Sequence, residues 1–242
     1  MARIGIIGSE GRMGQALARA IEAAGHENAG GVDKGADVAS LADRSDALVD
    51  FSAPAALEGN LHAAVGAGIP ILVGTTGLEE RHHAAIDSAA LAIPVLQTGN
   101  TSLGVTLLAH LVREAAARLS DEWDIEIVEM HHRMKVDAPS GTALLLGEAA
   151  AAGREIDLSA HSERGRDGHT GARAPGAIGF AALRGGTVAG EHSVILAGEH
   201  ERLTLSHSAE DRMIFAHGAV RGAAWLIGRP VGRYTMPQVL GL

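Results

Sequence analysis

The sequence has no cysteine, few aromatic residues and no long hydrophobic run. Without cysteine it can form neither disulfides nor thiolate metal sites. Aromatic residues make up 2% of the 242 residues, so we expect a core of alanine, valine, isoleucine and leucine. The most apolar stretch, residues 63–74, is interrupted by Gly66, Gly68 and Pro70, which argues against a membrane span there. The apolar run in MARIGIIG is too short for a signal peptide, and we expect a cytoplasmic protein with no membrane partner.

Positive charge is also scarce. The chain has 20 lysines and arginines against 29 aspartates and glutamates, a formal net charge of -9 at pH 7. This balance argues against nonspecific binding to nucleic acid, which requires a basic surface. It leaves room for a locally basic pocket, because one of the two lysines, Lys135, stands in the basic segment HHRMK at 131–135. Such a pocket would bind an anionic small molecule.

Strand patterns alternate with helical patterns over the first hundred residues. Short β-branched runs that end near glycine predict buried strands, and apolar residues three or four apart predict the helices between them. Strands separated by helices of this length form βαβ units with a parallel sheet. We expect strands at 3–8, 47–52, 69–74 and 93–99, and helices at 11–25, 54–68 and 78–92.

A different pattern follows residue 102. A long amphipathic helix, an alternating strand and a second helix lead to a polar segment rich in glycine, arginine and histidine, which predicts a long loop of functional importance. Three strands in succession then precede a final helix, which indicates a second, α+β domain. The expected ranges are helices at 102–120, 140–153 and 212–228, strands at 123–132, 178–184, 191–198 and 201–209, and a loop at 159–176.

The segment GIIGSEGRMG places Gly8, Gly11 and Gly14 where the first strand turns into the first helix. Glycines there let the backbone approach a pyrophosphate, which the helix N-terminus attracts. Glu10 replaces the second glycine of the usual pattern, but Asp33 follows at the expected end of the second strand, where an acid would hold the adenosine ribose. We interpret the segment as a dinucleotide site; the alternative is a structural turn with Asp33 merely exposed.

Two further features bear on the cofactor. Lys34 could pair with the extra phosphate of NADP, whereas Asp33 would repel it, so the two together predict use of both NADH and NADPH. The segments VGTTG at 73–77 and TGNTSLG at 98–104 each follow an expected strand and would face the ligand crevice of a parallel sheet. Their hydroxyl and backbone groups could meet the nicotinamide amide, although simple turns would explain both segments as well.

The segment HHRMKVDAPSGTA at 131–143 contains several side chains that can bind a polar ligand or exchange protons with it. His131 and His132 end a strand, so their side chains point to opposite sides and are poor joint metal ligands. No H-E-x-x-H pattern is present, and we expect no metal. His131, Arg133 and Lys135 would share one side if the chain stays extended. An imidazole and an ammonium group would then face one ligand.

A helix start follows directly. Ser140 is a natural N-cap, because Pro139 holds the preceding residue extended. The N–H groups of Gly141 and Thr142, with the two nearby hydroxyls, would form a receptor for a carboxylate. The alternative interpretation of the whole segment is a basic surface patch followed by a capped helix.

Taken together, these segments resemble a known family. In order, GSEGRMG, DFSAP, VGTTG, GNTSLGV, EMHHRMKVDAPSGTA and RMIFAHGAVRGAAWL are similar to the motifs of 4-hydroxy-tetrahydrodipicolinate reductase, long called dihydrodipicolinate reductase, of diaminopimelate and lysine biosynthesis. The resemblance implies an α/β fold with a Rossmann-like dinucleotide-binding domain at 1–102, rejoined by 212–242. It also implies an α+β domain with a mixed sheet at 103–211, which binds a cyclic dicarboxylate substrate and forms a homotetramer.

The resemblance assigns roles residue by residue. It implies catalysis by His131, as the acid, and Lys135, and substrate contacts at His132, Gly141 and Thr142. It implies NADH or NADPH contacts at Gly8, Ser9, Glu10, Gly11, Arg12, Met13, Asp33, Lys34, Gly74, Thr75, Thr76, Thr98, Gly99, Asn100 and Thr101. Thr101 departs from the family, which usually has an aromatic residue or methionine there. Two alternatives stay open: a noncatalytic dinucleotide-sensing module, which would not need the 131–143 segment, and another amino-acid-pathway dehydrogenase of similar fold.

Overall fold

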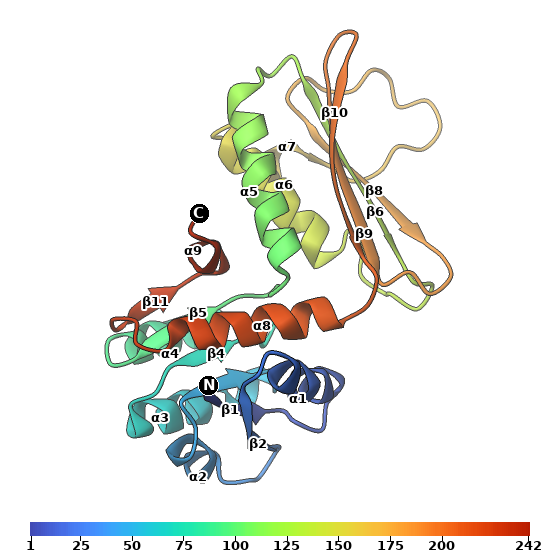
Figure 1. Ribbon diagram of the computed structural model, residues 1–242. Helices are drawn as coiled ribbons and strands as arrows, with labels where there is room; N and C mark the ends of the chain where they lie inside the picture. Colours follow the sequence, from blue (N-terminus) through green and yellow to red (C-terminus); the bar gives the residue numbers. More distant parts are fainter. The chain divides into compact units, whose positions relative to one another are not determined.

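A computed structural model describes all residues from 1 to 242. The chain divides into two compact units, one formed by Met1–Leu103 with Arg212–Leu242 and the other by Gly104–Asp211 (Figure 1). No helix of the structure combines the length and the apolar character needed to cross a membrane.

The first unit contains a six-stranded sheet in the order β11-β5-β4-β3-β1-β2, and every neighbouring pair in it is parallel. This confirms the predicted Rossmann-like architecture. Its strands are β1 Arg3–Ile7, β2 Glu27–Val32, β3 Ala47–Asp50, β4 Ile71–Val73, β5 Pro94–Gln97 and β11 Gly232–Tyr234. Its helices are α1 Arg12–Ala23, α2 Val38–Asp43, η1 Pro54–Ala56 (a 3-10 helix), α3 Leu57–Ala67, α4 Glu80–Ala90, α8 Met213–Leu226 and α9 Met236–Leu240.

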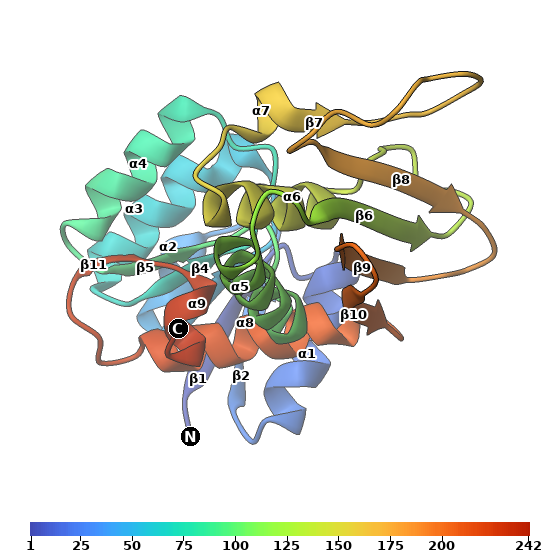
Figure 2. The ribbon, with the colours of Figure 1, turned by 90° about the horizontal axis from the view of Figure 1, so that it is seen from above.

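Helices cover both faces of this sheet (Figure 2). Successive residues of a strand point to opposite faces, so Ile4 and Ile6 of β1 join a core with α1, α8 and α9. Ile7, also on β1, joins the opposite core with α2, α3 and α4. Burial on both faces explains why these strands are continuous apolar runs in the sequence.

The second unit contains a five-stranded mixed sheet in the order β10-β9-β6-β8-β7. Strand β6 lies at its centre, parallel to β8 and antiparallel to β9. The helices α5 and α6 lie on one face (Figure 1), and β6 alternates strictly between buried and half-buried residues. The elements are α5 Leu103–Arg118, β6 Asp124–His131, α6 Gly141–Gly153, α7 Leu158–His161, β7 Ser162–Glu163, β8 Ile178–Arg184, β9 Gly190–Ala197 and β10 Arg202–Ala209.

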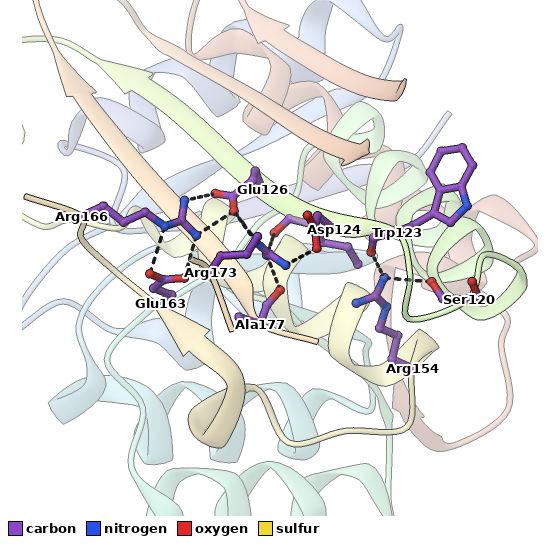
Figure 3. A network of polar contacts seen from close by, with 10 residues as sticks. Ser120, Trp123, Asp124, Glu126, Arg154, Glu163, Arg166, Arg173 and Ala177 are labelled. Carbon is purple, nitrogen blue, oxygen red and sulfur yellow. Dashed lines mark hydrogen bonds and ion pairs between the residues drawn. The ribbon is translucent and has the colours of Figure 1, made fainter. Parts of the chain in front are cut away.

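The expected loop at 159–176 is partly wrong. Its first residues form the end of the short helix α7 and the two-residue strand β7, which pairs with β8. The rest is anchored by ion pairs to β6, where Arg166 and Arg173 both reach Glu126 (Figure 3). Arg166 binds Glu126 through two nitrogens at 3.0 and 2.8 Å. The arginines of the segment therefore serve, in part, to hold it against the sheet.

Candidate active site

The glycine turn lies at the end of β1, next to β3. Gly8 has φ +88°, and a Cβ there would lie 2.6 Å from the carbonyl oxygen of Phe51. A Cβ on Gly14 would overlap the backbone of Gly8 and Ser9. Because β2 and β3 flank β1 on opposite sides, the turn occupies the switch point where open parallel sheets bind ligands.

Asp33 is tied to the glycine turn. Its carboxylate accepts hydrogen bonds from the Ser9 hydroxyl at 2.7 Å and from the backbone N–H of Glu10 at 2.9 Å. Glu10 and Lys34 are exposed. Gly11 caps α1 without a side-chain hydrogen bond, so the first N–H groups of the helix remain available to a phosphate. These features fit a dinucleotide: a glycine cradle, a helix N-terminus and an acid at the ribose position.

In the first of the two threonine segments, one threonine is buried and the next is exposed. Thr75 is buried, and its hydroxyl lies 3.3 Å from the carboxylate of Asp50. Asp50 is fully buried and also accepts hydrogen bonds from Ser52 and Asn60. Thr76, by contrast, is exposed next to it. Thr75 is therefore part of the packed structure at the end of β4. Thr76 is the threonine whose hydroxyl can reach a ligand.

The 98–101 segment is fixed partly by its own hydrogen bonds and partly by α8. The Thr98 hydroxyl donates to the carbonyl of Asn100 and accepts from its N–H. Gly74, in the other threonine segment, packs against the Phe51 ring. Thr101 is 2% exposed, and its hydroxyl donates to the carbonyl of Phe215 at 2.7 Å. The side chain of Thr101 is thus engaged with α8.

In the second unit, His131 ends β6 and is buried. Its Nδ1 lies 2.6 Å from the carboxylate of Glu129, which is 1% exposed. Arg184 of β8 binds the same carboxylate through two nitrogens at 2.8 and 2.9 Å. Burial raises the pKa of Glu129, but the hydrogen bonds from Arg184 and His131 outweigh it and leave the pKa below its ordinary value.

The chain from His131 to Lys135 does not stay extended, which was the condition for His131, Arg133 and Lys135 to share one side. After β6 the backbone turns, and the N–H of Lys135 donates to the carbonyl of His132 at 3.1 Å. The Nζ of Lys135 lies 2.8 Å from the carboxylate of Asp137, which lowers the pKa of Asp137. Arg133 is exposed, so it does not share the half-buried position of Lys135.

The predicted cap of α6 is confirmed. Ser140 is the N-cap, and its hydroxyl oxygen accepts from the N–H of Ala143 at 3.1 Å. The same oxygen lies 2.9 Å from Nε2 of His192, and the N–H of Ser140 donates to Glu129 at 3.1 Å. Gly141 is exposed in the first turn, and Thr142 is half-buried. The helix start and His131 therefore share one hydrogen-bonded network within this unit.

Three members of this network were missed by the sequence analysis: Glu129, Arg184 and His192. Glu129 carries a signal, because it stands two residues before His131 on a strand and must share its side. Arg184 and His192 lie on other strands and have no local signal. The structure brings no three histidine, aspartate or glutamate side chains together as a metal site.

Comparisons with known proteins cover nearly the whole chain. Models of the dihydrodipicolinate reductase N-terminus and C-terminus match residues 2–101 and 104–240. Two relatives are named 4-hydroxy-tetrahydrodipicolinate reductase, one from Rhodopseudomonas palustris (strain HaA2) and one from Zymomonas mobilis. They are 52% and 53% identical to this chain, and each alignment covers 99% of this chain and 97% of the relative. A dipicolinate-bound dihydrodipicolinate reductase structure from Paenisporosarcina shares the fold, with a TM-score of 0.75, 20% identity and 97% coverage of both chains.

Proposed function

This chain belongs to the dihydrodipicolinate reductase family, and we propose that it reduces 4-hydroxy-tetrahydrodipicolinate to tetrahydrodipicolinate, with loss of water and oxidation of NADH or NADPH. The product would feed diaminopimelate and lysine synthesis. The observation that carries the proposal is the joint network of His131, the Lys135 turn and the start of α6. A noncatalytic dinucleotide-binding module would have no need of it.

Residues of the first unit would hold the cofactor. The N–H groups at the start of α1 would face the pyrophosphate, with the turn from Gly8 to Met13 around it, and Asp33, held by Ser9 and Glu10, would bind a ribose. Thr76 and the 98–101 segment would border the nicotinamide. When bound, the reduced dinucleotide supplies a hydride to the ring carbon that carried the hydroxyl group.

Residues of the second unit would hold the substrate and move the proton. The N–H groups of Gly141 and Thr142 bind one carboxylate, and His132 contributes to binding the other. Lys135 donates a proton to the ring carbon beside the site of reduction, and His131 acts with it as acid or base. Lysine suits this role because, unlike arginine, its ammonium group can release a proton.

The choice of cofactor follows from two neighbouring charges. Asp33 is a ribose ligand suited to NADH, and the exposed Lys34 next to it can meet the 2′-phosphate of NADPH. We therefore propose that both cofactors support turnover. Because the reaction consumes a reduced nicotinamide dinucleotide, a cytoplasmic location is part of the same proposal.

A homotetramer built on the second unit is also proposed. The face of its sheet that carries no helix presents apolar side chains, including Val128, Met130 and Ile195, which are half-buried, and Leu183, which is 51% exposed. An open apolar sheet face of this kind marks an interface. Light scattering should give about four times the chain mass of 24.8 kDa, and Leu183→Glu should lower that mass. A monomer at micromolar concentration would refute the assembly.

The direct test is loss of NADH or NADPH absorbance with the condensation product of pyruvate and aspartate semialdehyde, generated by an aldolase in the same cuvette. Pyruvate alone and aspartate semialdehyde alone are the controls. Turnover that requires both is expected. If the protein binds the dinucleotide but oxidises neither cofactor above background, the dinucleotide-sensing alternative replaces the enzyme.

A further inference from the structure

Glu129 contacts three parts of the candidate active site at once. Its carboxylate lies 2.6 Å from Nδ1 of His131, 3.1 Å from the N–H of Ser140, and within hydrogen-bond distance of both terminal nitrogens of Arg184. With 1% exposure it is closed to solvent. A buried carboxylate without these partners would be strongly unfavourable, so the site is built around its charge.

The contact with His131 decides which ring nitrogen can react. A carboxylate accepts hydrogen bonds, so Nδ1 must carry the proton that it donates to Glu129. Nε2 is then the nitrogen left for proton exchange with a substrate. The position beside it is Gly190, where a Cβ would lie 3.0 Å from Nε2. A glycine at this point of β9 therefore leaves room at the reacting nitrogen.

Arg184 holds the carboxylate in place and extends the network to Lys135. It pairs with His131 across the parallel register of β6 and β8, which brings its guanidinium over Glu129. The fork of two hydrogen bonds fixes the plane of the carboxylate. Arg184 also donates to the carbonyl of Asp137 at 2.6 Å, and the side chain of Asp137 pairs with Lys135.

We propose that Glu129, oriented by Arg184, is a positioning residue that keeps His131 as the Nδ1–H tautomer with Nε2 directed to the substrate. The inference rests on the proposed function, in which His131 acts as acid or base. Glu129 does not touch the substrate; it acts through His131, and through the N–H of Ser140 it also sets the start of α6. Its removal should therefore impair turnover more than cofactor binding.

The test compares two glutamates of one strand. Glu129→Gln keeps the shape but replaces an acceptor with an amide that can donate to Nδ1 and so favour the opposite tautomer. Glu126→Gln is the matched control, because Glu126 also lies on β6 and also holds an arginine through two bonds, but no histidine (Figure 3). We expect kcat to fall about 10²-fold or more in Glu129→Gln, with the KM for NADH unchanged. Glu126→Gln should keep the kcat of the unaltered protein.

A second readout does not depend on turnover. Nitrogen NMR of protein labelled at histidine, with His131→Asn to assign the signal, should show proton-bearing Nδ1 at alkaline pH and its loss in Glu129→Gln. A kcat of Glu129→Gln within threefold of the unaltered protein overturns the inference while leaving the enzyme assignment intact. If Glu129→Gln does not fold, the tautomer of His131 in the unaltered protein tests the proposal instead. An Nε2–H tautomer there overturns it. If the unaltered protein is inactive but His131 has the Nδ1–H tautomer, the proposed function fails while the contact between Glu129 and His131 stands.

Discussion

The stability of the second unit should depend on pH through His192. This side chain is buried on β9, and its Nδ1 has no hydrogen-bond partner. Burial, helped by the charge of His131, lowers the pKa of His192 from 6.5 to about 4. The folded state therefore binds this proton less readily than the unfolded chain. The stabilisation is complete above about pH 6.5 and is lost as the pH falls toward 4.

The size of the effect follows from the two pKa values of His192. A pH of 5.0 is 1.5 units below the pKa of 6.5 of the unfolded imidazole, which is then almost fully protonated. The folded imidazole, with its pKa of about 4, remains mostly neutral at this pH. At about 1.4 kcal/mol per unit, the contribution of His192 to the free energy of unfolding falls by about 2 kcal/mol between pH 7.5 and pH 5.0. This is a large share of the stability of an ordinary domain.

The chain offers a specific probe for this measurement. It has two tryptophans, Trp123 in the second unit and Trp225 in the first. In a Trp225→Phe background, fluorescence during urea unfolding reports the second unit through Trp123. His192→Gln removes the titrating group, and His169→Gln, at an exposed position, is the control.

The measured quantity is the change in unfolding free energy between the two pH values. We expect that change to be smaller by about 2 kcal/mol in His192→Gln than in the Trp225→Phe parent, and unaltered in His169→Gln. Groups that are not coupled to His192 contribute equally to both proteins and cancel in the difference. Equal pH dependence in the His192→Gln protein and its parent would show that His192 does not titrate on unfolding.

Three further predictions concern the proposed reaction. Lys135→Ala should lose roughly 10²–10⁴-fold in kcat while cofactor affinity barely changes, as steady-state kinetics can show; turnover within a few-fold of the parent would remove Lys135 from the mechanism. Lys34→Ala should raise the KM for NADPH by about fivefold or less and leave that for NADH unchanged; equal losses would mean that Lys34 does not meet the 2′-phosphate. Pyridine-2,6-dicarboxylate should inhibit competitively and about tenfold to a hundredfold better than the monocarboxylate. Thr142→Val should narrow that gap, and unchanged inhibition constants would contradict the helix-start receptor.

Most of the fold could be predicted because local patterns and tertiary burial agree. Each expected strand from 3–8 to 201–209 has a counterpart, since strands buried on one or both faces must be apolar or alternate. Five elements were not predicted: α2, α7, β7, β11 and α9. They have between two and six residues, too few for a periodic pattern. Strand β11 exists because β5 offers it an edge, which the sequence of Gly232–Tyr234 does not show.

The candidate site could be predicted where its residues are consecutive and could not where they meet through space. Ser140 caps α6 as expected, because capping is decided within four residues. Arg184 reaches Glu129 because β6 pairs in parallel with β8 across 55 positions of sequence. Parallel pairing needs a crossover connection, and the pattern of three successive strands does not say that β6 lies between β8 and β9.

The turn after β6 changes what the basic segment can do. The structure pairs Lys135 with Asp137, whose side chain is 55% exposed. An ion pair this open contributes about 1 kcal/mol or less, so a substrate carboxylate can displace Asp137 at small cost. Arg184, by contrast, is bound to a buried carboxylate and stays where it is. The segment therefore places one exchangeable cation, Lys135, next to one fixed network, as the proposed proton donation to a bound anion would need.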